Sequence, residues 1–127
     1  MLVDSLQMLG DDPSIIGLPK EKVLSQPGPL VVVTGEARWY PRENITIMGV
    51  YLAVGTSPTG ADLIIELTRN GVSIGQYTLT SGTFNTPRLS VGESLVVGDY
   101  ISVNVIQVGT TEPGANLGMT LLYKSEV

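Results

Sequence analysis

The chain has 127 residues, of which 43% are hydrophobic and 15% charged, and its formal net charge is −5. This length is usual for one domain, which can bury a single core without disulfides or metals. Because phosphate binding needs a basic patch and the seven Lys and Arg residues are scattered, we expect no nucleic-acid partner. No apolar run approaches the ~20 residues of a membrane span, and no basic leader precedes an apolar stretch, so we expect neither a membrane segment nor a secretory signal.

Residues 1–29 differ in composition and hydrophobic pattern from the rest of the chain. They contain clusters of Pro and Gly and show no sustained hydrophobic period, so we interpret them as an extended N-terminal arm. Their many apolar side chains are unusual for a solvated tail, which predicts that the arm packs either on its own domain or on a neighbouring subunit. The candidate contact residues of the arm are Leu2, Leu6, Leu9, Ile15, Ile16 and Leu18.

Residues 30–127 alternate β-rich runs with turn signals about every ten residues, which predicts an all-β antiparallel sandwich of about seven to eight strands. The clearest runs are Leu30–Tyr40, Asn44–Val54, Leu63–Arg69, Val72–Leu79, Tyr100–Val108 and Leu117–Tyr123, with a shorter one in the stretch 89–97.

The run Asn44–Val54 reads as apolar on both faces. Strict alternation places Ile45, Ile47, Tyr51 and Ala53 on one side, and Met48, Val50, Leu52 and Val54 on the other. Such a strand is expected to be covered twice, or covered once and used at an interface.

The stretch G-V-S-I-G around Ser73 matches the spelling of a hydrolase nucleophile elbow. It follows Asn70-Gly71, the strongest short-range signal for a β-hairpin, and the chain has no histidine to activate a serine. We therefore interpret Ser73 as a hairpin residue and expect no catalytic site and no enzyme. Without His and Cys, and without a calcium-loop motif, we expect no metal and no cofactor either.

Trp39 and Tyr40 stand beside two arginines, Arg38 and Arg42. Trp, Tyr and Arg dominate binding hot spots, so Trp39 and Tyr40 are candidate partner-contact residues. The alternative, which we favour for Trp39, is that it caps one end of the core.

Residues 45–75 (ITIMGVYLAVGTSPTGADLIIELTRNGVSIG) and 89–123 (LSVGESLVVGDYISVNVIQVGTTEPGANLGMTLLY) share strand and turn motifs with known virion proteins. These motifs resemble bacteriophage virion β-sandwich modules of the capsid decoration, head-fibre and tail-fibre type. The resemblance covers about residues 39–123, implies a jelly-roll-like fold, and carries no catalytic residues.

Such modules are commonly homotrimers on virions, so the resemblance implies copies of this chain and the major capsid protein, or another virion protein, as partners. The small size and the absence of shaft repeats favour a capsid decoration (cement) protein, made in the host cytoplasm and located on the capsid surface. The alternative is a tail or head fibre module that recognises a host glycan or protein with Trp39, Tyr40 and loop residues around Thr56–Asp62 or Thr110–Asn116.

Overall fold

A computed structural model of the chain describes residues 18–35 and 38–126. This part forms seven strands, and it holds no helix long and apolar enough to cross a membrane. The strands are β2 (Lys20–Pro29), β3 (Ile45–Ala53), β4 (Leu63–Arg69), β5 (Val72–Leu79), β6 (Leu89–Leu95), β7 (Ile101–Gln107) and β8 (Ala115–Ser125).

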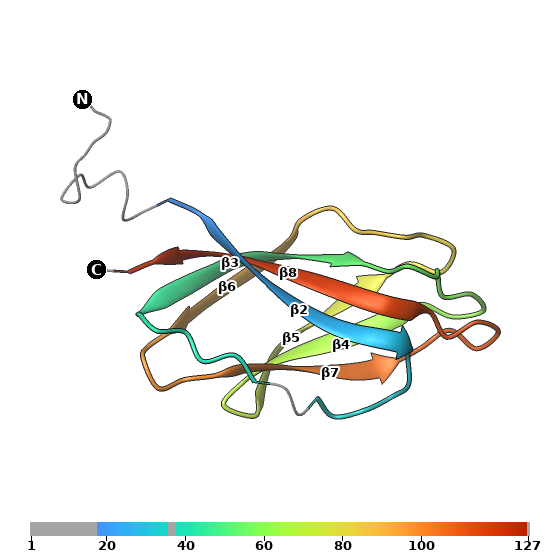
Figure 1. Ribbon diagram of the computed structural model, residues 1–127, viewed down its shortest axis with the longest axis horizontal. Helices are drawn as coiled ribbons and strands as arrows, with labels where there is room; N and C mark the ends of the chain where they lie inside the picture. The colour runs from blue at the N-terminus through green and yellow to red at the C-terminus, as the bar shows by residue number, and fades with distance from the viewer. Residues whose placement is uncertain (1–17, 36–37, 127) are drawn as a thin grey trace.

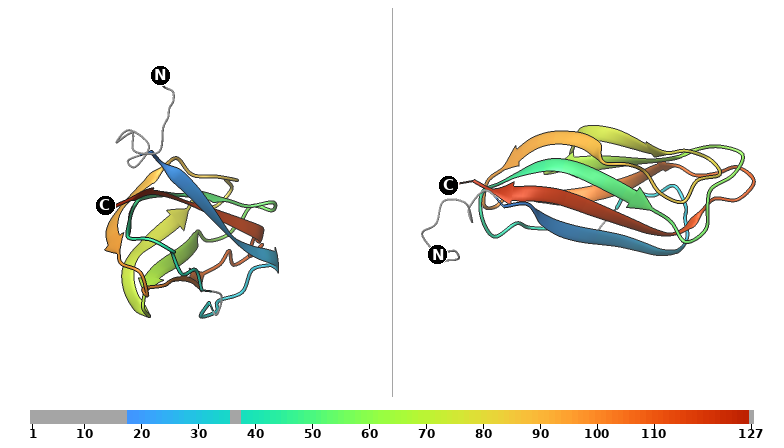
Figure 2. Two further views of the ribbon diagram at one scale, coloured as in Figure 1. Left: turned by 60° about the vertical axis from the view of Figure 1, so that its left-hand side comes forward. Right: turned by 90° about the horizontal axis from the view of Figure 1, so that it is seen from above.

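The strands form two antiparallel sheets that face each other (Figures 1 and 2). One sheet has the order β2-β8-β3-β6, and the other has the order β5-β4-β7. The pairings are nested along the chain, because β4 pairs with β5, β3 with β6, and β2 with β8. A long hairpin rolled up in this way is a jelly roll, so the predicted all-β antiparallel sandwich is confirmed.

The core lies between the two sheets and is almost entirely aliphatic. Alternate residues of each strand point inward, as a pleated strand dictates. The buried hydrophobic side chains are Leu30, Ile45, Ile47, Val50, Leu52, Val54, Leu63, Ile65, Leu67, Leu79, Leu95, Ile101, Val105, Leu117, Met119 and Leu121.

A β-bulge in β3 overturns the assignment of its residues to two sides by strict alternation. Both of its pairings shift register between Ile47 and Gly49. Opposite β8, Met48 is an extra residue of β3, whereas opposite β6 the extra residue lies on β6, between Ser90 and Glu93. The bulge changes the alternation, because Ile45 and Ile47 on one side of it and Val50 and Leu52 on the other all point into the core. Strict alternation from the sequence misplaced half of the strand.

The last ten residues of the predicted arm are part of the sandwich. Residues 20–29 form β2, which pairs with β8 from Lys20 opposite Tyr123 to Pro29 opposite Ala115. Leu24 packs against the core, and Pro27 and Pro29 are tolerated because β2 is an edge strand. The boundary of the sandwich therefore moves from Leu30 to a position before Lys20.

In its described residues, 30–35 and 38–40, the predicted strand Leu30–Tyr40 is largely irregular. It touches β7 at two isolated bridges, Val33 with Val105 and Trp39 with Ile101. Val33 and Trp39 are six residues apart, whereas their partners Val105 and Ile101 on β7 are four apart. A continuous ladder therefore cannot form between the two bridges. Gly35 instead donates its N–H to the Asn104 side chain at 2.9 Å. The segment still occupies the outer edge of the three-stranded sheet, beside β7.

Candidate interaction surface

Consecutive valines stand exposed at the outer edge of the three-stranded sheet. The exposed fractions are 59% for Val31, 64% for Val32 and 38% for Val33. We call residues 31–34 the valine edge; they follow β2 and lie beside β7 (Figure 1). Single exposed hydrophobic residues are normal, whereas several consecutive ones at a sheet edge make a candidate contact surface.

A shallow groove of about 450 Å³ runs beside the valine edge. Val32, Val33 and Thr34 line it together with Val105 and Ile106 of β7, and Ile106 is also exposed. Glu66 and Asn104 add polar groups to its lining, with the Asn104 amide donating to Glu66 at 3.0 Å. The groove therefore offers contacts to both apolar and polar groups.

Glu66 remains charged at neutral pH. Hydrogen bonds from Asn104, then from Ser73 and Gln76, lower the pKa of its carboxyl group from the ordinary value. One carboxylate already held by neighbouring donors does not provide a catalytic pair. Within the described residues, no group of three or more potential metal ligands occurs.

Ser73 lies near the start of β5, directly after a tight turn. Asn70 and Gly71 have φ angles of 53° and 85°, which are the positive values that a type I′ hairpin needs. The following residues form a strand, whereas a nucleophile elbow leads into a helix. The predicted hairpin is confirmed, and the local geometry at Ser73 is that of a strand.

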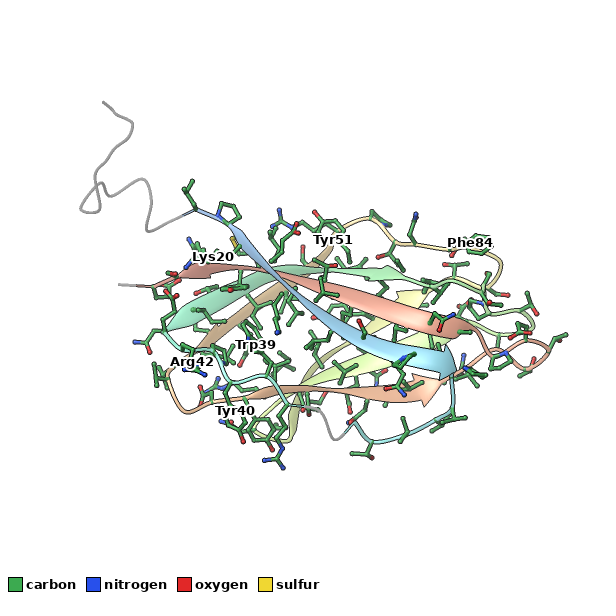
Figure 3. The ribbon with its side chains drawn as sticks, in the orientation of Figure 1. Lys20, Trp39, Tyr40, Arg42, Tyr51 and Phe84 are labelled. Atoms are coloured by element: carbon green, nitrogen blue, oxygen red, sulfur yellow. The ribbon has the colours of Figure 1, made fainter. Side chains whose placement is uncertain are left out.

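Trp39 and Tyr40 point in different directions (Figure 3). Trp39 is half-buried against the core, with its ring centroid 5.1 Å from that of Tyr123. Tyr40 is 49% exposed and lies 5.5 Å from Tyr100, and the Arg38 guanidinium sits 4.2 Å above the Tyr100 ring. Trp39 is thus a packing residue, while Tyr40 belongs to a small exposed aromatic cluster with Arg38 and Tyr100.

The two loops proposed as binding loops are tied to each other. Thr59 bridges Glu112, and Thr56 bridges Ala115. The N–H of Thr59 donates to the Glu112 carbonyl at 2.9 Å. They form one connected loop cluster at an end of the sandwich.

Of the candidate residues in the arm, the structure places one. Leu18 precedes β2 and is 53% exposed. Leu2, Leu6, Leu9, Ile15 and Ile16 lie outside the described residues. The valines at 31–33 were assigned to a strand from the sequence, although three β-branched residues in a row without alternation already signalled that one of them faces solvent.

No family model matches the chain, and no curated protein matches it. The Drosophila NLP-core, whose structure was described for pentamer formation and histone binding, is 13% identical, with a TM-score of 0.44 over 84% of this chain and 98% of that chain. An acetyl xylan esterase from the rumen bacterium Butyrivibrio proteoclasticus is 16% identical, with a TM-score of 0.42 over 84% of this chain and 29% of that chain.

The carbohydrate-binding module CBM36, solved with calcium and xylotriose, is 16% identical, with a TM-score of 0.29 over 84% of this chain and 72% of that chain. Likenesses of this size carry no argument about function. The functional interpretation depends on the surface of this chain.

Proposed function

We propose that this protein is a structural component of a bacteriophage virion, a capsid decoration (cement) protein that binds the capsid surface and stabilises the shell. The observation that carries the proposal is the valine edge, an exposed apolar strip on a sandwich whose core is almost entirely aliphatic. The sequence resemblance to phage virion modules supports the same class. In this proposal the protein is not an enzyme, and it works by adhesion.

The proposed mechanism is burial of apolar surface across a seam between capsid subunits. Covering a valine completely contributes about 1.5–3 kcal/mol, so three partly exposed valines contribute a few kcal/mol in total. A single contact of that size is weak once the costs of association are subtracted. Many copies on one shell, each also held by its N-terminal arm, make the total contribution large.

The partners in this proposal are the major capsid protein, or another virion protein, and further copies of this chain in a homotrimer. The protein is made in the host cytoplasm and is then located on the outside of the capsid. Neither nucleic acid nor a membrane takes part.

Co-sedimentation with empty capsids of the virus that encodes the chain tests the proposal. Wild-type protein is expected to pellet with capsids and to raise the temperature at which they disrupt. Val32→Lys is expected to lose this binding, because it places a charge in the buried contact. Val72→Lys is the matched control, because Val72 is 69% exposed on the distant strand β5. Equal binding by all three proteins, or by none, would contradict the proposal.

A second candidate function is recognition of a host glycan or protein by a tail or head fibre module. The exposed cluster of Tyr40, Tyr100 and Arg38 favours it, because aromatic rings and Arg are common contact groups. Tyr40→Ala is the appropriate variant for a glycan array or a host-cell pulldown. Trp39→Ala is unsuitable, because the Trp39 ring packs against the core.

A further inference from the structure

The valine edge lacks the features that protect β2, the edge strand of the facing sheet, from pairing with another strand. β2 carries Lys20, Glu21 and Lys22 and ends in Pro27 and Pro29. Charges and prolines of this kind prevent another strand from adding to an edge. Residues 30–35, Leu-Val-Val-Val-Thr-Gly, contain neither.

The backbone of the valine edge is arranged to accept a strand. Val33 and Val105 exchange two hydrogen bonds, with N–H to carbonyl distances of 3.1 and 2.9 Å. In an extended backbone, successive residues direct their N–H and C=O groups to opposite sides. Since Val33 uses its groups on β7, an added strand that extends the backbone on either side of this bridge pairs with the groups of Val32 and Thr34.

The N-terminal residues of the chain contain a segment that matches this edge. Ser14-Ile15-Ile16-Gly17 places two adjacent β-branched residues together, the type of side chain that pairs well across strands. Asp11 and Asp12 precede it, and Arg38 is exposed beyond the far end of the valine edge. An antiparallel strand with Ile15 and Ile16 on the valines runs its two carboxylates toward that arginine.

The length of chain between Ile16 and Lys20 determines whether the segment can come from the same copy or must come from another. Gln26 and Gly35 line the same apolar cavity of about 90 Å³, so Gly35 lies beside Gln26 of β2. The chain reaches Gly35 from the end of β2 through residues 31–33, so these valines lie beside the part of β2 that follows Gln26. That is at least about 20 Å along β2 from Lys20. Ile16 precedes Lys20 by four residues and extends at most about 14 Å from it. The Ile15-Ile16 pair cannot reach the valine edge of its own chain.

We infer that the valine edge binds the Ser14–Gly17 segment of a second copy of this chain as an added antiparallel β-strand. This inference rests on the proposed function and refines it: a second copy of this chain, and not the capsid, covers the valine edge, and the oligomer formed in this way is what binds the shell. It is tested without capsids. The contact joins two different surfaces, so it builds a reciprocal dimer or a ring where the rotation between copies closes, and an open filament where it does not.

Complementation of two full-length variants tests the inference. Ile15→Lys combined with Ile16→Lys removes the arm contact, whereas Val32→Lys removes the edge. Sedimentation equilibrium at tens of micromolar is expected to show an oligomer for wild type and for the control Val72→Lys, and monomers for each of the two variants. An equimolar mixture of the two is expected to form a 1:1 heterodimer, because one functional arm and one functional edge remain. A monomeric wild type, an oligomeric single variant, or a mixture that stays monomeric would overturn the inference.

A disulfide trap keeps the test decisive if a lysine variant folds poorly. The chain has no cysteine, so Ile15→Cys on one copy and Val32→Cys on another can form only the expected bond or the homodimeric ones. Oxidation of the mixture is expected to give predominantly the mixed dimer, distinguished by a size tag on one copy. Val72→Cys in place of Val32→Cys is expected to reduce the yield at least tenfold, and equal yields would contradict the inference. Capsid binding by a protein that forms no oligomer would show that this inference fails alone. Oligomer formation without capsid binding would show that the proposed function fails alone.

Discussion

Two neighbouring stretches of similar length, β2 and residues 30–40, behave in opposite ways. β2 contains prolines, a glycine and alternating charges, yet it pairs with β8 along nearly its whole length. The stretch that follows is rich in valine, yet in its described residues the backbone pairs with β7 at only two isolated bridges. Side-chain pattern describes which residues are suited to a strand, but the register available on the neighbouring strand decides whether a ladder forms.

The second stretch is therefore held at a few points. Leu30 is 1% exposed and donates its N–H to the Gly114 carbonyl at 2.9 Å. Trp39 exchanges two hydrogen bonds of 2.9 Å with Ile101. The valines between these points are the part that faces solvent.

The largest decrease in the free energy of unfolding is expected from Leu30→Ala. Truncation of a buried leucine removes contacts and leaves a cavity, which costs about 2–5 kcal/mol. The free energy of unfolding from urea denaturation measures it. A loss as small as that for an exposed valine would show that this stretch is not anchored at Leu30.

A smaller decrease in the free energy of unfolding is expected from Gly35→Ala. A Cβ built on Gly35 would lie 1.7 Å from the Val103 carbonyl oxygen, so the backbone must move away from β7. Forcing atoms into a filled space costs about 1–3 kcal/mol. Gly92→Ala is the matched control, because nothing lies within 4 Å of its Cβ position. Equal unfolding free energies for the two variants would contradict the close approach seen here.

Acid is expected to loosen the start of β2. A hydrogen bond from Ser125, and then one from Lys20, lower the pKa of Glu43 from its ordinary value of 4.5. A folded pKa below the unfolded one contributes stability above about pH 4.5, and this contribution is lost as the pH falls through the folded value. Urea midpoints at pH 6 and pH 3 measure it, and Glu43→Gln is expected to reduce the difference between them. An unchanged difference would mean that other carboxylates carry the pH dependence.

The smallest effect on stability is expected from Val32→Ala. Substitutions at exposed positions usually change the free energy of unfolding by no more than about 0.5 kcal/mol. The same variant is expected to weaken oligomer formation at least tenfold, as measured by sedimentation. If it instead unfolds the protein as readily as Leu30→Ala, the valines belong to the core, and the contrast between the two residues disappears.

Elements with regular alternation were predictable from the sequence. Ile101, Val103 and Val105 of β7 point inward as expected, and so do Leu117, Met119 and Leu121 of β8. The Asn70-Gly71 hairpin was also predictable, because few residue pairs tolerate positive φ at both positions.

Features that depend on distant pairing were not predictable. The bulge at Met48 arises where β3 meets both β6 and β8, so no local pattern reveals it. β2 pairs with a strand at the opposite end of the chain, and its prolines resemble those of a linker. Likewise, Arg38 lies over Tyr100, a contact that only the bridge between Trp39 and Ile101 creates.

The pairing of β2 with β8 also determines how the sandwich carries mechanical load. Lys20 at the beginning of one strand lies opposite Tyr123 near the end of the other, so both strands leave the sheet on the same side. Tension between residues 18 and 126 therefore peels the two strands apart one hydrogen-bonded pair at a time, which needs little force. Tension applied from β2 along its length to another part of the sandwich loads all of these pairs together, so the molecule withstands more force in that direction.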